Sequence, residues 1–327
     1  MDIGLSVWLD RPARDCAEIA AAAEAAGFST LWVPDHYFLR DSFVALALAA
    51  ERTTRIRLGT AVASPLLRHP ALLASSFATL SELSDGRAVA GLGTGGSEFG
   101  SQLGLPIEQP LALVRDSVEI VKSLFTGPAN VGGSVFTAEG ARLGWTPGAM
   151  PVYLAARGPR MLELSGEIAD GVITHGLAPS HLQFVEERVK KGTAKAERES
   201  QACQIVLMFD YEHDDDRVSA LHRLRDRCMF MIGGSYADEL IPLYGLDPEQ
   251  VHPIRAFVRS DKYREAIEAI TPEMVEAFAV AGSVEWLAER LDVLASQGVG
   301  GVILGLGGNT VDEVLARIQR VGPAVVR

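Results

Sequence analysis

Eight short apolar segments alternate with stretches of helical pattern along this chain, and no other feature constrains the fold as strongly. They are residues 3–8, 29–33, 56–62, a run that begins at residue 87, and residues 151–155, 171–174, 204–209 and 301–306. Short apolar runs bounded by turn residues are typical of buried strands. A helix between two strands returns the chain to the same end of the sheet, so such strands pair in parallel. The pattern predicts an α/β fold, the (β/α)8 TIM barrel, with an open doubly wound sheet as the alternative.

Two segments exceed what eight strand–helix units require, and we expect them as insertions after strands 4 and 7. Residues 127–150 carry many glycines and predict a hairpin with strands over 134–137 and 141–145. Residues 210–282 predict several helices, the first over 218–232. Ser283 follows as the expected N-cap of a helix over 283–297. One barrel domain with two insertions is therefore expected to use the whole chain, residues 1–327.

The composition is that of a soluble protein with a large core, since 48% of the residues are hydrophobic and 22% are charged. A net charge of −12 argues against nucleic acid or an anionic membrane surface as the main partner. The chain shows neither a leader pattern nor an apolar run of membrane-spanning length. Cys16, Cys203 and Cys228 lie too far apart for a disulfide framework or a paired metal motif. We expect a cytoplasmic protein that acts on a small molecule.

The stretch RAVAGLGTGGSEFG, residues 87–100, is a strand pattern that runs into a loop with five glycines. Glycine has no Cβ, so such a loop lets the backbone approach a flat or phosphorylated ligand closely. The spacing is neither that of a P-loop nor that of a dinucleotide fingerprint, and a tight turn is the alternative explanation. The loop predicts a ligand only in combination with the other strand ends.

Groups suited to proton transfer and anion binding stand at those other strand ends. Asp35 and His36 follow the second strand and could move a proton, although a hydrogen-bonded structural histidine is the alternative. After the fifth strand, Arg157 and Gly158-Pro159 form a helix start, where backbone N–H groups and an arginine favour a phosphate. His175 is the other histidine near a strand end.

Three runs of the chain resemble the bacterial luciferase-like monooxygenase superfamily: LWVPDH, GTAVASPLLRHPALLASSFATLSELSDGRAVAGLGTG and VYLAARGPRMLELSGEIADGVITHG. Within it they are most similar to the branch dependent on the deazaflavin coenzyme F420, which includes methylenetetrahydromethanopterin reductase. The resemblance covers residues 3–174 and, more weakly, residues 283–306.

This resemblance implies a barrel with insertions, a homodimer, and F420 or FMN with its ring in the barrel mouth. His36 and Glu98 are the implied catalytic residues, and Asp35 an implied ring contact. Ala63 and Ser64 match a strand-end bulge, often with a non-prolyl cis peptide, that supports one face of the ring. The remaining implied cofactor contacts are Gly93, Thr94, Ala156, Arg157, Gly158, Pro159 and Thr174.

Several functions stay open at this point. F420 exchanges a hydride, whereas reduced FMN can activate oxygen, so an FMN-dependent monooxygenase is the first alternative. A flavin-binding barrel without turnover is the second. The sugar-phosphate dehydrogenases of the F420 branch carry a glutamate directly after the GTG of the fourth strand, where this chain has Gly96 and Ser97, so a glucose-6-phosphate dehydrogenase is not expected. Candidate pocket aromatics are Trp8, Phe38, Phe99 and Trp145.

Overall fold

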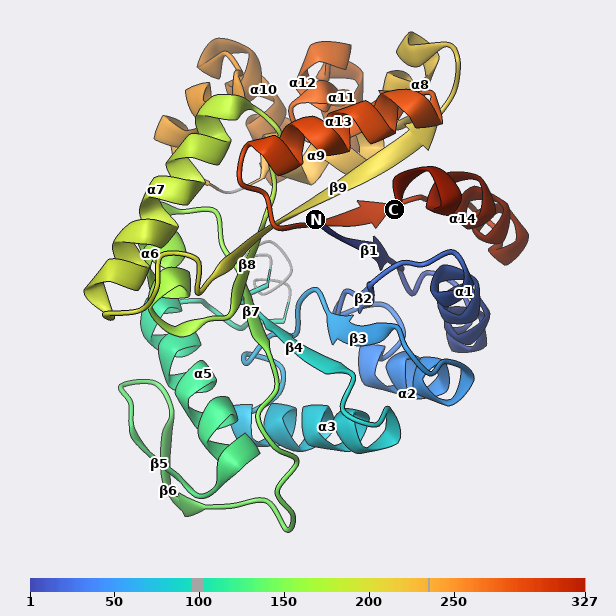
Figure 1. Cartoon of the computed structure of the whole chain (residues 1–327). Helices are drawn as coiled ribbons and strands as arrows, with labels where there is room; N and C mark the ends of the chain where they lie inside the picture. Colours follow the sequence, from blue (N-terminus) through green and yellow to red (C-terminus); the bar gives the residue numbers. More distant parts are fainter. Residues whose placement is uncertain (96–102, 235, 327) are drawn as a thin grey trace.

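Eight parallel strands close into a barrel in the computed structural model, which describes residues 1–95, 103–234 and 236–326 (Figure 1). In order around the barrel they are β1 (Asp2–Ser6), β2 (Thr30–Val33), β3 (Arg57–Thr60), β4 (Ala88–Leu92), β7 (Val152–Ala155), β8 (Gly171–Thr174), β9 (Gln204–His213) and β11 (Gly301–Gly305). Strand β11 pairs in parallel with β1, from Asp2↔Gly301 to Ser6↔Gly305. This closure confirms the predicted TIM barrel and excludes the open sheet.

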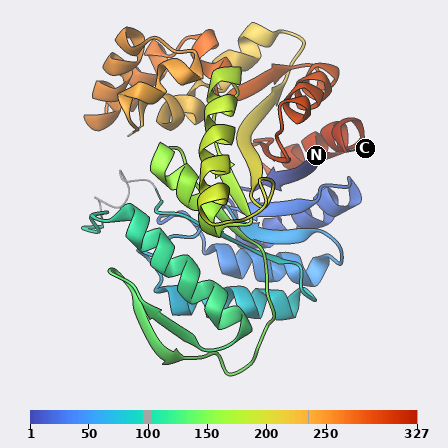
Figure 2. The same ribbon diagram turned by 60° about the vertical axis from the view of Figure 1, so that its left-hand side comes forward.

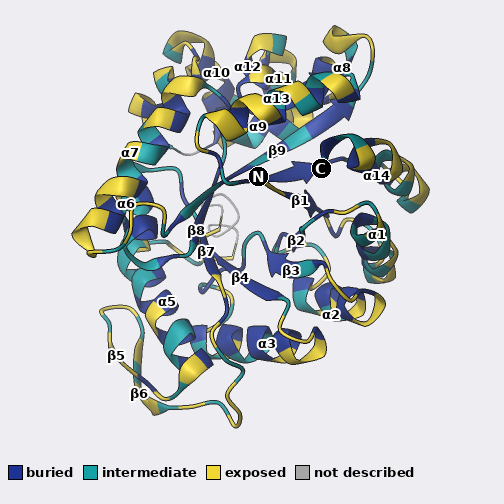
Figure 3. Cartoon of the chain, viewed as in Figure 1, coloured by how far each residue is buried: buried dark blue, intermediate teal, exposed yellow. Residues whose placement is uncertain are grey.

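Helices cover the outside of the barrel and bury one side each (Figures 2 and 3). They are α1 (Ala13–Ala25), α2 (Ser42–Arg52), α3 (Pro70–Leu83), α5 (Pro110–Thr126), α6 (Pro159–Ile168), α7 (Pro179–Lys195), α13 (Val284–Ser296) and α14 (Val311–Val325). Helix α1 buries Cys16, Ile19, Ala20 and Ala23, which lie on one face by their spacing. Gly27 then turns the chain with a φ of 90°. Ser283 caps α13 as expected, because its side chain accepts the N–H of Trp286.

Side chains fill the interior of the barrel. Trp32, Val89, Tyr153, Ile173, Val206 and Ile303 form one buried cluster. Two neighbouring strands have glycines where Trp32 needs room: a Cβ on Gly4 would lie 2.7 Å from its Nε1, and one on Gly59 would lie 2.9 Å from its Cζ3. The inside of the barrel is therefore core, and a ligand must use the ends of the strands.

The segment between α5 and β7 forms an antiparallel hairpin of β5 (Ala129–Gly132) and β6 (Thr137–Ala141). The sequence prediction of a hairpin is right, but the predicted strand positions, 134–137 and 141–145, are wrong. Residues 135 and 136 lie in the turn, because the Asp116 carboxylate accepts the N–H groups of Val135 and Phe136 at 2.7 and 3.1 Å. A side chain on another element thus sets the register.

Between β9 and α13 the chain forms a group of helices with its own apolar cluster. These are α8 (Arg217–Arg223), α9 (Arg225–Gly233), α10 (Pro248–Arg259), α11 (Tyr263–Ala269) and α12 (Pro272–Glu276). The single helix predicted over 218–232 is wrong, since the chain bends at Leu224. Arg223 binds carboxylates of β9, whereas Cys228 and Ile232 pack with the helical cluster, and the bend allows both.

Strand β9 extends four residues beyond the predicted end at Phe209. Its last part pairs in parallel with a ninth strand that the sequence did not reveal, β10 (Ala279–Gly282), from Ala279↔Asp210 to Gly282↔His213. The same strand thus belongs to the barrel and to the helical group above it. In the described part of the chain, no helix combines the length and apolarity needed to cross a membrane.

Candidate active site

Most of the predicted site residues meet at one end of the barrel, because the strands are parallel and each residue follows or ends a strand. The described ones are Asp35, His36, Ala63, Ser64, Gly93, Thr94, Ala156, Arg157, Gly158, Pro159 and Thr174. Glu98 and Phe99 lie outside the described residues. Neighbouring strand ends contact each other directly: the Gly93 N–H donates to the Ala63 carbonyl at 3.1 Å. The Ser64 hydroxyl likewise donates to the Thr94 carbonyl at 3.0 Å.

Packing of the strands already requires the first glycines of the glycine-rich run. A Cβ on Gly91 would overlap the Thr60 carbonyl oxygen, and one on Gly93 would lie 2.7 Å from Val62 Cγ2. Gly95, at a φ of 76°, lies against the Tyr37 hydroxyl. These glycines therefore have a structural reason, and the cofactor contact predicted for Gly93 stays a prediction. The cis peptide implied near Ala63 and Ser64 is present two residues earlier, between Ala61 and Val62.

His36 lies half-buried among aromatic rings at the end of β2. Its ring centroid is 5.8 Å from that of Trp8, 6.0 Å from Tyr37 and 6.1 Å from Phe38. Burial lowers the pKa of His36, so the ring is neutral at pH 7. The Phe38 N–H donates to Nδ1 at 3.4 Å, which assigns the ring proton to Nε2. His36 thus carries a neutral imidazole with one N–H donor.

Asp35 is engaged with the start of the next helix. Its carboxylate accepts the Ser42 hydroxyl at 2.8 Å and lies 3.5 Å from Arg68 Nε. Arg68 also binds Asp41 at 2.6 Å. These bonds hold the connection from β2 to α2, and the direct ring contact predicted for Asp35 stays a prediction.

Arg157 points into the helical group, where its guanidinium is already bound. Its Nε donates to the Tyr244 hydroxyl at 3.2 Å and its Nη2 to the Met231 carbonyl at 2.9 Å. The guanidinium also lies 4.2 Å from the Tyr236 ring centroid, a cation–π contact. A phosphate would have to compete with these partners. Gly158 is the N-cap of α6 and Pro159 its first residue, so the predicted helix start is present, and anion binding there stays a prediction.

Two buried hydroxyls at strand ends fit a polar ligand. Thr174 is the last residue of β8 and Ser6 is the last residue of β1. The hydroxyl oxygens of both, Thr174 Oγ1 and Ser6 Oγ, have no hydrogen-bond partner among the residues that the structure describes. A buried hydroxyl without a partner costs free energy, which a polar ligand group can recover. Together with the helix start at Gly158, these groups fit a phosphorylated ring cofactor.

A cavity of about 410 Å³ opens beside this site, between the ends of β1, β9 and β11 and helix α9. Trp8, the neighbour of His36, lines it, and so do His175, Asp210 and Arg227. Sequence reasoning missed the last two, because Asp210 was assigned to the insertion and not to a strand end. Phe38 and Trp145, also predicted as pocket aromatics, are exposed at 53% and 41%.

Comparison with known proteins assigns the family. The sequence profile described as luciferase-like monooxygenase matches residues 3–300. The chain belongs to this luciferase-like family. Among curated relatives, it is 34% identical over 289 residues to 5,10-methylenetetrahydromethanopterin reductase of Archaeoglobus fulgidus, with 86% of each chain covered. It is 27% identical over 325 residues to F420-dependent glucose-6-phosphate dehydrogenase of Gordonia bronchialis, covering 94% of this chain and 91% of that one.

The solved structures agree with this assignment. The luciferase-like chain matches the coenzyme F420 dependent tetrahydromethanopterin reductase of Methanopyrus kandleri with a TM-score of 0.86 and 27% identity. The match covers 98% of both chains, so it includes the hairpin and the helical group as well as the barrel.

Proposed function

We propose that this luciferase-like protein is an F420-dependent oxidoreductase that transfers a hydride between the deazaflavin and a small organic substrate. The observation that carries the proposal is the match to the Methanopyrus kandleri F420 dependent reductase over 98% of both chains. The 34% identity to a methylenetetrahydromethanopterin reductase supports the same chemistry. Both relatives are reductases, so hydride transfer is favoured over the FMN-dependent oxygen chemistry of the alternative.

The residues at the barrel mouth divide into a binding set and a reacting set. The helix start at Gly158 and the Thr174 hydroxyl would hold the phosphorylated part of F420, and the strand end at Ala63 and Ser64 would support the ring. When bound, F420 would exchange a hydride with the substrate at one ring carbon. The Nε2–H of His36 would donate a hydrogen bond to the substrate.

Titration of the purified protein with F420 and with FMN tests the proposal. We expect saturable binding of F420 and much weaker binding of FMN, both measured by the change in cofactor fluorescence. Tight FMN binding without F420 binding would overturn the proposal. His36→Ala separates an enzyme from a non-catalytic barrel. In an enzyme this change lowers reduction of any accepted substrate by about 100-fold with F420 affinity retained, whereas in a non-catalytic barrel it changes neither.

We also propose that the protein is a homodimer through α2 and α3. These adjacent helices expose Val44 at 57%, Leu48 at 40% and Leu72 at 56%. Apolar side chains this exposed on neighbouring helices favour association with an identical surface. A reducing, cytoplasmic location is proposed as well, because Cys16, Cys203 and Cys228 are all free and buried.

A further inference from the structure

Three aromatic rings of the helical group contact the guanidinium of Arg157. Its central carbon lies 4.2 Å from the ring centroid of Tyr236, 5.4 Å from that of Tyr244 and 5.9 Å from that of Phe278. The rings also contact one another, because the centroid of Tyr244 lies 5.6 Å from that of Tyr236 and 4.8 Å from that of Phe278. We call these three residues the aromatic cage.

Neutral groups hold the positive charge of Arg157 in this cage. Besides the three rings, its partners in the described part of the chain are the Tyr244 hydroxyl and the Met231 carbonyl, and no carboxylate is among them. A guanidinium is planar, so it stacks on rings with its face and donates hydrogen bonds along its edge. The rings and the two oxygens together therefore fix its orientation.

The ring nearest to this guanidinium, that of Tyr236, is itself held by further contacts. Its hydroxyl donates to the Ile232 carbonyl at 3.0 Å. A second guanidinium, that of Arg255 in α10, lies 4.1 Å from its ring centroid. Arg255 is buried and forms an ion pair with Asp238. The aromatic cage is therefore part of the packed helical group and not a loose surface contact.

Arg157 connects this cage to the start of α6. It stands directly before Gly158, the N-cap of that helix, where no side chain caps the helix end. The Ala156 N–H donates to the Ile173 carbonyl at 3.0 Å, which ties the same segment to β8. Ala156 and Gly158 have no side chain long enough to reach the helical group, so Arg157 makes that connection. A Cβ on Gly158 would meet no described atom within 4 Å, so the space beside the helix start is open.

We propose that Arg157 is a positioning residue for the cofactor and not one of its ligands. The aromatic cage holds Arg157, and Arg157 holds the start of α6 where the backbone N–H groups of Gly158 and Arg160 can meet an anion. The helical group thereby sets the cofactor affinity without a contact of Tyr236 or Tyr244 with the cofactor. This inference rests on the proposed function, because that function supplies the phosphorylated cofactor at this helix start.

Tyr236→Leu distinguishes this role from direct phosphate binding by Arg157, because the two roles predict changes of opposite sign. As a ligand, Arg157 would have to leave the cage, so removal of a cage ring would make F420 bind more tightly. As a positioning residue, it needs the ring, and we expect Tyr236→Leu to weaken F420 binding by about tenfold. Tyr236→Phe keeps the cation–π contact and should bind F420 within about twofold of the unmodified protein. Tighter or unchanged binding in Tyr236→Leu would overturn the proposal.

Two further variants separate this effect from a general loosening of the helical group. Phe257→Leu removes an aromatic ring outside the cage that packs on the same apolar cluster, and it should leave the F420 affinity unchanged. Tyr244→Phe removes the hydroxyl that accepts Arg157 Nε but keeps all three rings of the cage, so we expect about threefold weaker F420 binding in a folded protein. An equal loss of affinity in Phe257→Leu, or full affinity in Tyr244→Phe, contradicts the positioning role.

The side-chain N–H signal of Arg157 gives a measurement that does not depend on affinity. Ring currents of the aromatic cage should shift this signal upfield in a nitrogen–proton correlation spectrum, and its absence from the spectrum of Arg157→Lys assigns it. We expect the signal to keep this shift when F420 saturates the protein. A signal that moves to the position of exposed arginines on F420 binding would show that Arg157 leaves the cage, and the proposal would then be wrong.

The same titrations with FMN separate this inference from the proposed function. FMN also carries a phosphate, so the order of affinities among the variants should be the same for whichever cofactor binds. FMN binding without F420 binding would sink the proposed function, and the variants would still decide the role of Arg157. Binding of neither cofactor by the unmodified protein would overturn both proposals.

Discussion

At the scale of single residues, two histidines with strongly lowered pKa values make stability depend on pH. Burial lowers the pKa of His175 and of His181 from 6.5 to about 4. Between these values the unfolded chain binds protons that the folded chain does not, so stability falls as pH falls through this window. Each histidine contributes up to about 1.4 kcal/mol per pH unit there.

Replacing one of the two histidines measures its share of the pH dependence of the unfolding free energy. His181 stacks on Tyr244, with ring centroids 4.5 Å apart, and phenylalanine can take over that contact. We expect His181→Phe to reduce the loss of unfolding free energy between about pH 7 and about pH 5 by roughly half. Urea unfolding at both pH values measures it, and an unchanged difference would rule out this histidine as a source.

Gly91 gives a second prediction at this scale. Because a Cβ there would overlap the Thr60 backbone, we expect Gly91→Ala to cost about 3 kcal/mol or more of unfolding free energy. Gly144→Ala is the control, since no atom lies within 4 Å of its added Cβ, and it should change stability by less than about 0.5 kcal/mol. Thermal unfolding compares the two, and a Gly91→Ala protein as stable as the control would contradict the packing argument.

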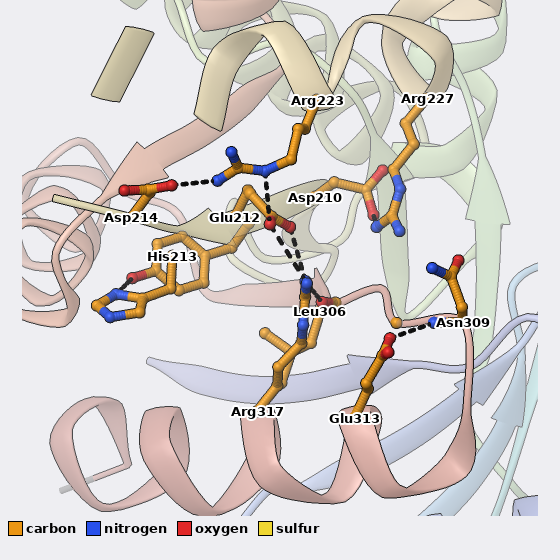
Figure 4. A network of polar contacts seen from close by, with 12 residues as sticks. Asp210, Glu212, His213, Asp214, Arg223, Arg227, Leu306, Asn309, Glu313 and Arg317 are labelled. Atoms are coloured by element: carbon orange, nitrogen blue, oxygen red, sulfur yellow. Dashed lines mark hydrogen bonds and ion pairs between the residues drawn. The ribbon is translucent and has the colours of Figure 1, made fainter. Parts of the chain in front are cut away.

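At the scale of elements, a buried carboxylate joins three parts of the fold. Glu212 of β9 accepts Arg317 Nη1 of α14 at 2.6 Å and Arg223 Nε of α8 at 3.2 Å (Figure 4). We expect Arg317→Met to destabilise the protein by about 3 kcal/mol, because it leaves a buried charge with one partner. Arg264→Met, in an exposed pair with Glu268, should leave the stability nearly unchanged in the same denaturation assay. Similar costs for the two variants would contradict this role.

The elements also explain what the sequence could and could not predict. Strands and helices of the barrel follow from local apolar patterns, and the gathering of residues such as His36 and Thr174 at one end follows from parallel pairing. Local patterns do not contain the contact of Asp116 with the hairpin turn or the pairing of β9 with β10. Asp210 was missed for that reason, because its strand position follows from pairing with Ala279 of β10 and Gly305 of β11, both far away in the sequence.

At the scale of the whole molecule, the proposed dimer can be broken by charge. Val44→Lys together with Leu72→Lys would place lysines in the buried interface, and we expect a monomer in sedimentation measurements. Val218→Lys changes an apolar residue that is 58% exposed on α8 and should leave the assembly unchanged. A double variant that sediments like the unmodified protein would refute this interface.

The shared strand β9 determines how ligands can be exchanged. It passes from the barrel into its pairing with β10 without a break, so β9 is at once part of the barrel wall and part of the helical group beside the cavity. We expect ligand exchange to depend on the rotation of side chains that line the cavity, such as Arg227. We then expect changes in substrate range to come from substitutions of single side chains that line the cavity, while the strands keep their arrangement.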